Sequence, residues 1–469
     1  MKSAMATGPN RRSVLGALAS TVAIPLAGRA APALPRVAVI GGGMAGVATA
    51  WLLDGACEVV LFEARESIGG NVRTVDLVVD GEPYRVDAGA QYFHPGPYPT
   101  YVALLEALEL YPPETGGSHA FAASITLGDP AEAHPRFVSP VLPGRAWPLV
   151  APWNRAGLAA FNRAFGAAGR REQRNASWQL ALGDWLPTLG LDAAQWEGMI
   201  LPWAASIHSG DVEQARSLSA RAAMIFAAKA LPPNPTDPIL YYVVDQGMVE
   251  VLQRMAAQFT TVQTLTNTPV TGVARSGSGG FLVQAGAGPA LPVDFVVFAA
   301  SGPPTLALLA GIDGTALQRA ALQAIEFFDA RLMLHTDPVY APADPRHWSF
   351  LNCRVQGAYC EASMWLADVL VPAPGVPPPQ LWKSWVTHRA ELPSAVLHES
   401  AYRHLLPTPA TIRAQSALRA TQGQGGVWFA GGYTRPYDSQ ETALLSAIDV
   451  ADAIVGPTAR RRALRARAG

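Results

Sequence analysis

The sequence has very little lysine. Only Lys2, Lys229 and Lys383 among its 35 basic residues are lysines, and the rest are arginines. Charged residues make up 15% of the 469 residues, and the formal net charge is −1. The lack of a basic surplus argues against a nucleic-acid-binding protein. Because the chain is also 49% hydrophobic, it can bury a core, which excludes disorder over most of its length.

Cysteine is scarce as well. Cys57, Cys353 and Cys360 are an odd number and form no C-x-x-C motif, so the sequence predicts neither a disulfide framework nor a zinc site. A Cys353–Cys360 bridge is possible after export, but we expect free thiols. The nine histidines form no H-E-x-x-H motif or other metal-binding spacing, and we expect no metal site.

Both ends of the chain are basic, whereas the segment between them is acidic. Residues 1–33 carry four basic residues and no acid, and residues 457–469 carry five arginines. Residues 34–456 therefore have a net charge of −10, which disfavours anionic polymers as partners. We expect residues 457–469 to be a disordered, solvated tail.

The first 33 residues resemble an export signal. Arg11–Arg12 precede the apolar run Val14–Gly28 of 15 residues, which is too short for a bilayer span of about 20 residues. Ala31–Ala33 offers a cleavage site of the A-x-A kind. The paired arginines resemble a twin-arginine signal, so we expect the twin-arginine (Tat) translocase as a partner and a periplasmic or secreted protein without a transmembrane span. The alternative is an uncleaved amphipathic leader on a cytoplasmic protein.

A dinucleotide-binding pattern follows the leader. It contains a β-branched strand, a G-x-G-x-x-G turn, a helix, a second strand and an acid, in the segments Arg36–Ile40, Gly41–Gly46, Val47–Leu53, Glu58–Phe62 and Glu63. Glycines at the turn let the backbone approach a pyrophosphate at the helix N-terminus. Glu63, 20 residues after Gly43, is placed to bind ribose hydroxyls. The segment therefore predicts a strand–helix–strand unit that binds a dinucleotide.

The residues after Glu63 point to FAD. Glu63–Gly70 reads E-A-x-x-x-x-G-G, and Val86–Gly89 reads V-D-x-G. Together they resemble the flavin-containing amine oxidase superfamily, which binds FAD, and most closely its uncharacterised branch of predicted FAD/NAD-binding proteins. Gly426–Thr434 resembles the closing strand and turn of that superfamily, and Gln440–Ala447 resembles its flavin-packing helix start. At such a helix start, backbone N–H groups and the helix dipole favour a reduced flavin.

The middle of the chain fits the same layout more loosely. Thr268–Val270 opens a strand, a second strand lies around Phe281–Gln284 and a third around Phe295–Ala300, with a glycine-rich turn at Ser276–Gly280. The resemblance implies an α/β fold in which an FAD-binding Rossmann-like domain with a β-meander joins a mixed α+β substrate domain. We predict the FAD-binding domain at 34–115, 240–305 and 416–456, and the substrate domain at 116–239 and 306–415.

The resemblance also assigns residues to the cofactor. These are Gly41, Gly43, Met44, Ala45, Gly46, Glu63, Ala64, Arg65, Gly69, Gly70, Val270, Gly431, Glu441, Thr442 and Ala443.

The sequence departs from the superfamily at the expected lysine. Amine oxidases of this kind place a lysine near flavin N5, where it holds a water and aids reoxidation by oxygen. The corresponding strand, Asp329–His335, has no lysine, although Arg331 or His335 could take over part of the role. Lys383 lies in the alternating segment Leu381–Trp385 and could point inward, but a lysine on a half-buried strand more commonly faces solvent. Lys229 is expected to face solvent.

A second departure concerns the aromatic cage that flanks the amine in many of these enzymes. One cage position is Ser439 here, although Tyr433 or Tyr437 could supply a ring. Our candidates for catalytic residues are Lys383, His335, Trp385 and Tyr433. Further side chains to inspect are Trp203, His208, Trp348 and His404, for which core packing or a structural hydrogen bond is the simpler explanation.

These features predict an FAD-dependent oxidoreductase. We expect it to abstract hydride from a C–N or C–C unit of a small organic substrate, in the manner of an amine oxidase, and to pass the electrons to oxygen or another acceptor. One alternative is a flavin-dependent desaturase or isomerase of a lipid-like substrate. The other is a non-catalytic, exported FAD-binding protein.

Overall fold

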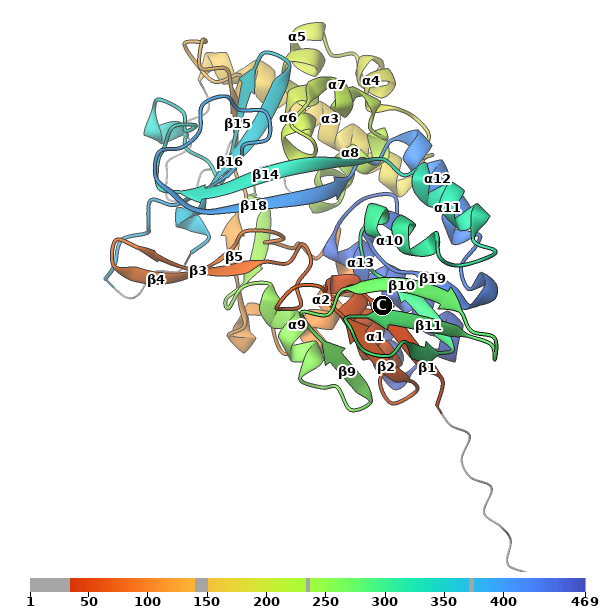
Figure 1. The fold of residues 1–469 in the computed structure, drawn as a ribbon. Coiled ribbons are helices and arrows are strands. Elements are labelled where there is room, and N and C mark those ends of the chain that lie inside the picture. Colours follow the sequence, from red (N-terminus) through yellow and green to blue (C-terminus); the bar gives the residue numbers. More distant parts are fainter. Residues whose placement is uncertain (1–33, 140–150, 233–236, 371–374, 469) are drawn as a thin grey trace, which may run out of the picture. The chain divides into compact units, whose positions relative to one another are not determined.

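The structure is a computed structural model that describes residues 34–139, 151–232, 237–370 and 375–468 (Figure 1). The predicted export signal lies outside the described residues. Pro35–Gly469 forms one compact unit. Among the described residues, no helix is long and apolar enough to cross a membrane.

The dinucleotide-binding pattern folds as predicted, around a five-stranded parallel sheet. Its strands, in spatial order, are β19 (Val427–Phe429), β13 (Phe295–Phe298), β1 (Arg36–Ile40), β2 (Glu58–Phe62) and β9 (Val262–Leu265). Both faces of this sheet are covered, as apolar parallel strands require. Val37 and Val39 of β1 pack with helices, whereas Ala38 and Ile40 pack with the opposite layer.

The two covering layers are a helical one and a β-meander. The helices are α1 (Met44–Leu53), α2 (Pro99–Ala107), α9 (Val249–Ala256) and α13 (Gln440–Val455). The meander is an antiparallel sheet of β10 (Val270–Arg275), β11 (Phe281–Ala285) and β12 (Leu291–Val293). This arrangement confirms the predicted fold class.

A hairpin follows the Gly69–Gly70 segment and ends at Asp87. It consists of β3 (Thr74–Val79) and β4 (Glu82–Asp87). Asp80 and Gly81 form the turn with φ values of 53° and 87°, which are the positive values that a two-residue hairpin loop needs. These two residues therefore suit the tight turn that joins β3 to β4.

A second, seven-stranded sheet supports the candidate active site. In spatial order its strands are β18 (Val396–Leu405), β14 (Phe327–His335), β17 (Trp382–Trp385), β16 (Tyr359–Trp365), β15 (Leu351–Gln356), β6 (Ile125–Gly128) and β7 (Phe137–Val138). All pairs are antiparallel except β15 with β6. The long strands β14 and β18 run side by side (Figure 1).

Helices and short strands complete the described chain. Several helices follow β7 and precede β14 in the sequence. They include α3 (Arg155–Gln173), α4 (Leu182–Trp185), α5 (Ala193–Gln195), α6 (Leu201–Ile207), α7 (Val212–Ser217) and α8 (Ala220–Ala230). β5 (Ser118–Ala122) pairs with β8 (Leu240–Val244), and α10 (Gly302–Leu309), α11 (Ala316–Gln323) and α12 (Pro409–Arg419) lie nearer the C-terminus in sequence. The domain boundaries given above stay a prediction.

The expectation of a disordered C-terminal tail is wrong. Ala459–Ala468 forms a helix, α14, that packs against α2. Two contacts explain the order: Leu464 is fully buried, and Arg460 Nη2 lies 3.0 Å from the buried carboxylate of Asp54. Arginine density alone predicted a solvated tail, whereas the buried Leu464 and the ion pairs of Arg460 and Arg461 anchor the segment. The expectation of free thiols is confirmed, since all three cysteines are unpaired and buried.

Candidate active site

The G-x-G-x-x-G turn forms a cradle that only glycine fits. A Cβ on Gly46 would lie 1.8 Å from the carbonyl oxygen of Gly41, and a Cβ on Gly41 would lie 2.7 Å from Ala300 N. Gly41 also has a φ of +113°, which side-chain-bearing residues rarely adopt. α1 begins at Met44 without a side-chain cap or an acid in its first turn. Its first N–H groups therefore have no side-chain cap, which leaves them available to a pyrophosphate.

Glu63 closes the other side of this cradle. The side chain is 6% exposed, and its Oε2 accepts a hydrogen bond from Gly42 N at 2.7 Å. Its Oε1 accepts one from Arg65 N at 2.9 Å. Each carboxylate oxygen can accept a further hydrogen bond, so Glu63 is fixed in place and still able to receive ribose hydroxyls.

Two further predicted segments meet at the same loop. Gly69 N donates to Gly42 O at 2.8 Å, and a Cβ on Gly70 would lie 2.8 Å from Gly43 Cα. Thr268 N donates to Glu63 O at 2.9 Å, which places the start of β10, at Val270, beside the predicted ribose-binding acid. The space at the glycine turn and the N–H groups at the start of α1 fit the diphosphate of FAD. The Glu63 carboxylate fits its ribose.

The start of α13 lies against α1, because Ala443 and Leu444 pack with Ala45 and Ala48 in one core. Ser439 caps α13 through a reciprocal pair with Thr442, which explains why the cage position carries a small hydroxyl residue here. Both carboxylate oxygens of Glu441 accept N–H groups of α2, from Thr100 at 3.2 Å and Tyr101 at 2.7 Å. Glu441 therefore ties α13 to α2, and its predicted role at the cofactor stays a prediction.

Lys383 points inward, so the expectation of a solvent-facing lysine is wrong. It is 2% exposed, and its Nζ donates to Asp87 O at 2.8 Å, Gly89 O at 2.6 Å and the Oε1 of Gln91 at 3.0 Å. The alternation of β17 against two neighbouring strands turns this side chain toward the V-D-x-G segment. All three hydrogens of the ammonium group have acceptors, so Lys383 holds the second sheet against the Asp87–Gln91 segment.

The Asp87 carboxylate faces the same lysine from a buried position. It accepts hydrogen bonds from Thr74 Oγ1 at 2.6 Å and from Met248 N at 3.0 Å. Burial raises the pKa of Asp87, and burial lowers the pKa of Lys383 while the Asp87 charge opposes that fall.

Three more side chains share a face of the second sheet with Lys383. Strand pairing puts Trp385 of β17 and Tyr402 and His404 of β18 on this side. The ring of Trp385 lies edge-on to that of Tyr402 at 6.2 Å and to that of His404 at 5.6 Å. We call the side that carries these four residues the lysine face.

Tyr402 links the lysine face to Gly89 and, through Arg73, to Gly70 of the predicted FAD motif. Its hydroxyl would be 3.2 Å from a Cβ on Gly89, and the Arg73 guanidinium lies 4.6 Å above its ring. Arg73 Nε in turn donates to Gly70 O at 3.4 Å. We did not predict Tyr402 as a site residue, although the two-residue spacing of Ser400, Tyr402 and His404 could have indicated one face of a strand.

His335 does not lie beside Lys383, and its catalytic role stays a prediction. Strand pairing turns it to the opposite face of the sheet, where its Nε2 lies 2.8 Å from Ser384 Oγ. Burial lowers the pKa of His335 to about 4, which keeps the ring neutral in a structural hydrogen bond. Arg331 is no substitute either, because it is partly exposed and pairs with Glu399 at 2.8 Å.

Tyr433 does not lie on the lysine face either. Its hydroxyl donates to Phe298 O at 2.9 Å, and the ring belongs to the core between the parallel sheet and the meander. Tyr437 packs near Trp178 and Phe226. Neither tyrosine therefore restores the superfamily's cage by direct substitution for Ser439.

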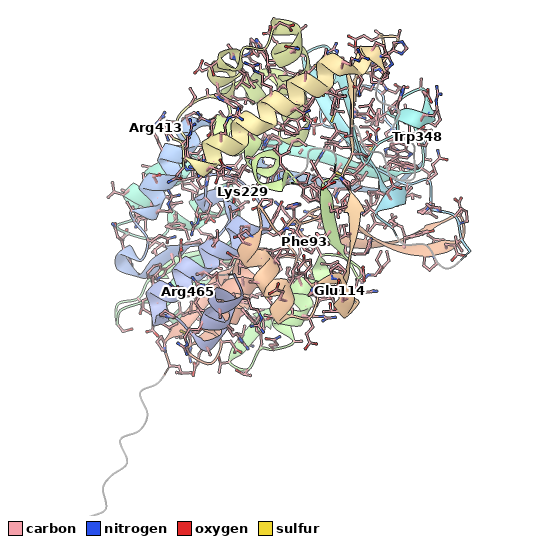
Figure 2. The ribbon with its side chains drawn as sticks, turned by 180° about the vertical axis from the view of Figure 1, so that it is seen from behind. Phe93, Glu114, Lys229, Trp348, Arg413 and Arg465 are labelled. Atoms are coloured by element: carbon pink, nitrogen blue, oxygen red, sulfur yellow. The ribbon has the colours of Figure 1, made fainter. Side chains whose placement is uncertain are left out.

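The remaining inspected residues have structural roles or lie beside the site. Trp203 packs against Phe165, and Trp348 packs against Trp382. Figure 2 shows Trp348 among the strands, well apart from Lys229 on α8. Lys229 pairs with Glu172 at 3.4 Å and is about one-third exposed. His208 is the exception, because its imidazole interacts electrostatically with that of His404.

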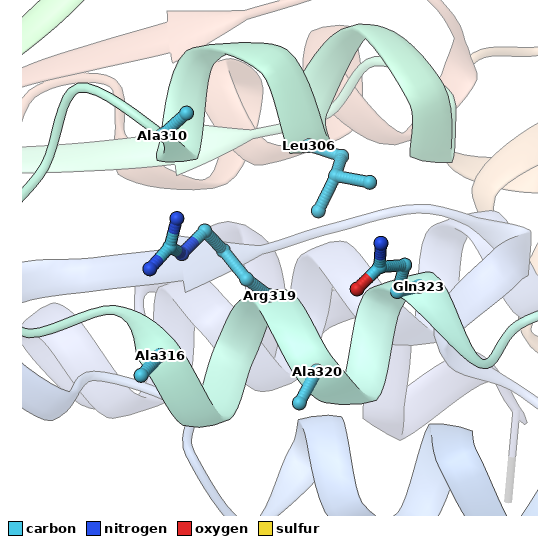
Figure 3. A pocket seen from close by; sticks show the side chains of 6 residues that line it. All are labelled: Leu306, Ala310, Ala316, Arg319, Ala320 and Gln323. Carbon is cyan, nitrogen blue, oxygen red and sulfur yellow. The ribbon is translucent and has the colours of Figure 1, made fainter.

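A groove between α10 and α11 lies outside the predicted flavin site. Figure 3 shows Arg319 and Gln323 of α11 facing Leu306 of α10 across it. No predicted site residue lines the groove, and it is not the candidate active site.

Comparison with known proteins establishes the family. The model of the flavin containing amine oxidoreductase family matches residues 44–330, which is more than half of the chain. The chain belongs to this family, and it is an FAD-dependent oxidoreductase. No curated protein sequence matches it.

Solved structures share the fold at low sequence identity. Putrescine oxidase bound to putrescine is 16% identical with a TM-score of 0.63, and the match covers 90% of this chain and 99% of that one. A CLA-producing fatty acid isomerase from P. acnes is 13% identical with a TM-score of 0.62, covering 90% and 98%. Cyclohexylamine oxidase from Brevibacterium oxydans IH-35A is 15% identical with a TM-score of 0.58, covering 90% and 99%. At these identities the likeness establishes the fold alone.

Proposed function

We propose that this enzyme oxidises a small organic substrate at a C–N or C–C single bond, in the manner of an amine oxidase. The observation that carries the proposal is the meeting of the lysine face with the Asp87–Gln91 segment, through the three hydrogen bonds of Lys383. That segment belongs to the motif that resembles the superfamily's FAD site. A substrate on the lysine face would therefore lie beside the cofactor.

The chain's own residues would bind and orient the reactants. Glu63 and the first turn of α1 are suited to hold the ribose and the diphosphate. Lys383 fixes the Asp87–Gln91 segment, and the rings of Trp385 and Tyr402 supply an apolar surface that excludes water. FAD, when bound, supplies the hydride acceptor.

A lipid-like substrate is the second candidate. Trp385 and Tyr402 meet at an interplanar angle of 79°, so they do not form the two parallel rings that would flank an amine. Leu332, Leu334 and Met364 lie on the lysine face as well. An apolar surface of this composition would suit a hydrocarbon chain, and the fatty acid isomerase has the same fold.

Anaerobic reduction of the purified holoenzyme tests the proposal. We expect at least one member of a panel of aliphatic amines and amino acids to bleach the flavin absorbance. Bleaching or isomerisation by unsaturated fatty acids alone would favour the second candidate. If no member of either panel reduces the flavin while dithionite does, the proposed oxidation is wrong.

We also propose that the enzyme is exported by the twin-arginine route, because Arg11–Arg12 precede a short apolar run and a possible cleavage site. In a bacterial host with this route, Arg11→Lys/Arg12→Lys should move the protein from the periplasm to the cytoplasm in cell fractionation. Arg29→Lys is the matched control, since it conserves the charge in the same leader outside the pair. Equal periplasmic amounts of the double variant and the wild type would contradict export by this route.

A further inference from the structure

His404 has one nitrogen facing a carboxylate and one nitrogen without a partner. Its Nδ1 lies 3.7 Å from Asp438 Oδ2, which is ion-pair distance and longer than a hydrogen bond. Its Nε2 is buried and has no hydrogen-bond partner among the described residues. Buried polar nitrogens are almost always paired, so this nitrogen is free to bind a water or a ligand at the lysine face.

The surroundings of His404 place it at the candidate active site. Asp438 precedes Ser439, the cap of the predicted flavin-packing helix. The rings of Trp385 and Tyr402 lie 5.6 and 5.7 Å from the imidazole, and the Tyr402 hydroxyl lies beside Gly89. The ring is thus held between the strand that carries it and the start of α13.

We propose that His404 is a catalytic residue, which takes a proton from the substrate through Nε2, and that Asp438 is its positioning residue. This inference rests on the proposed function. In the reaction the substrate carbon loses hydride to the flavin, and the adjacent nitrogen or carbon loses a proton to Nε2. The remaining electron pair forms the new double bond, the flavin is reduced by two electrons, and neutral imidazole becomes imidazolium.

Asp438 explains why Nε2 would be the basic nitrogen. A carboxylate facing Nδ1 favours the tautomer with its proton on Nδ1 and leaves the lone pair on Nε2. The same carboxylate stabilises the imidazolium that forms. Catalytic hydrogen bonds are often long in the absence of substrate, so 3.7 Å is compatible with this role.

Three titratable groups face His404. Asp438 faces it from the loop before α13, Tyr402 lies on its own strand, and His208 interacts with it from the end of α6. Burial lowers the pKa of His208 to about 4. Burial raises the pKa of Tyr402.

Stopped-flow reduction of the flavin across pH tests the catalytic role. In the wild type, with a substrate found by the panel, the reduction rate should fall as pH drops, because the imidazole becomes protonated. His404→Gln should lower the plateau rate by about 100-fold or more and remove that ionisation. Asp438→Asn should give a smaller loss and shift the ionisation to lower pH. His119→Gln is the control, since this histidine also faces an aspartate, Asp245, but both its nitrogens have partners.

A nitrogen-15 NMR measurement of the free holoenzyme gives a readout that needs no turnover. The resonances of His404, identified by their loss in His404→Gln, should show a bare Nε2 and a proton on Nδ1. Asp438→Asn should weaken that preference. A protonated Nε2, or a full reduction rate with an unchanged pH profile in His404→Gln, would overturn the proposal and leave a buried water as the partner of Nε2. Absence of any reduction in the wild type would instead count against the proposed function.

Discussion

Gly46→Ala is expected to abolish stable FAD binding. The added methyl group would lie 1.8 Å from Gly41 O, far inside van der Waals contact, so either the loop or the start of α1 must move. Overpacking of this kind costs about 3 kcal/mol, which corresponds to about a 100-fold weaker affinity if the cradle bears the distortion. The flavin-to-protein absorbance ratio after gel filtration, and titration of the apoprotein with FAD, measure the loss.

Gly277→Ala is the matched control for this substitution. A Cβ on Gly277 would have nothing within 4 Å, so the variant should keep its full flavin content. Far-UV circular dichroism of both variants distinguishes loss of the cradle from loss of the fold. A folded Gly46→Ala protein with a full complement of tightly bound FAD would show that the cofactor does not lie in this cradle.

The cofactor half of the site could be predicted from the sequence because it depends on the backbone. Glycine spacing, the acid after the second strand and the strand pattern are local features, and the structure brings Gly41, Glu63 and Gly69 together as expected. The strand–helix–strand order also constrains the parallel sheet. These signals survive a low overall identity because they follow from backbone geometry.

The substrate half could not be predicted in the same way, because it depends on which face of a strand a side chain occupies. Lys383 and Ser384 are neighbours in sequence but point to opposite faces, and Lys383 finds its acceptors nearly 300 residues away. A single lysine on an alternating strand carries no information about its partners. His335 shows the converse, since its residue type suggested catalysis while its register placed it on the far face.

Lys383→Met is expected to lower the free energy of unfolding by about 3 kcal/mol, because it leaves the buried acceptors of Nζ and the buried Asp87 carboxylate without their partner. Asp87 O, Gly89 O and Gln91 Oε1 would lose their donor. Chemical denaturation of the holoenzyme measures the change. Lys229→Met is the matched control: its ammonium group is about one-third exposed in an ion pair, so its loss should cost about 1 kcal/mol or less.

The same substitution should change how stability depends on pH. Burial lowers the pKa of Lys383 below its unfolded value, so the unfolded state binds more protons than the folded state between those two values. Lys383 should therefore make a contribution to stability that rises with pH up to the unfolded lysine value of about 10.4, seen as the difference between the wild type and Lys383→Met. Lys383→Met should lose this alkaline rise, and an unchanged slope would show that the buried amine does not titrate there.

Oxygen reactivity decides whether Lys383 also acts on the cofactor. Its three hydrogens are already taken by protein acceptors, which leaves none to hold a water as the family resemblance implies. We therefore expect the rate of flavin reoxidation by oxygen to differ less than about threefold between the wild type and Lys383→Met, a change below 1 kcal/mol. Stopped-flow mixing of the reduced enzymes with oxygen measures it. A fall of two orders of magnitude with unchanged stability would instead show that Nζ leaves its acceptors and works at the flavin.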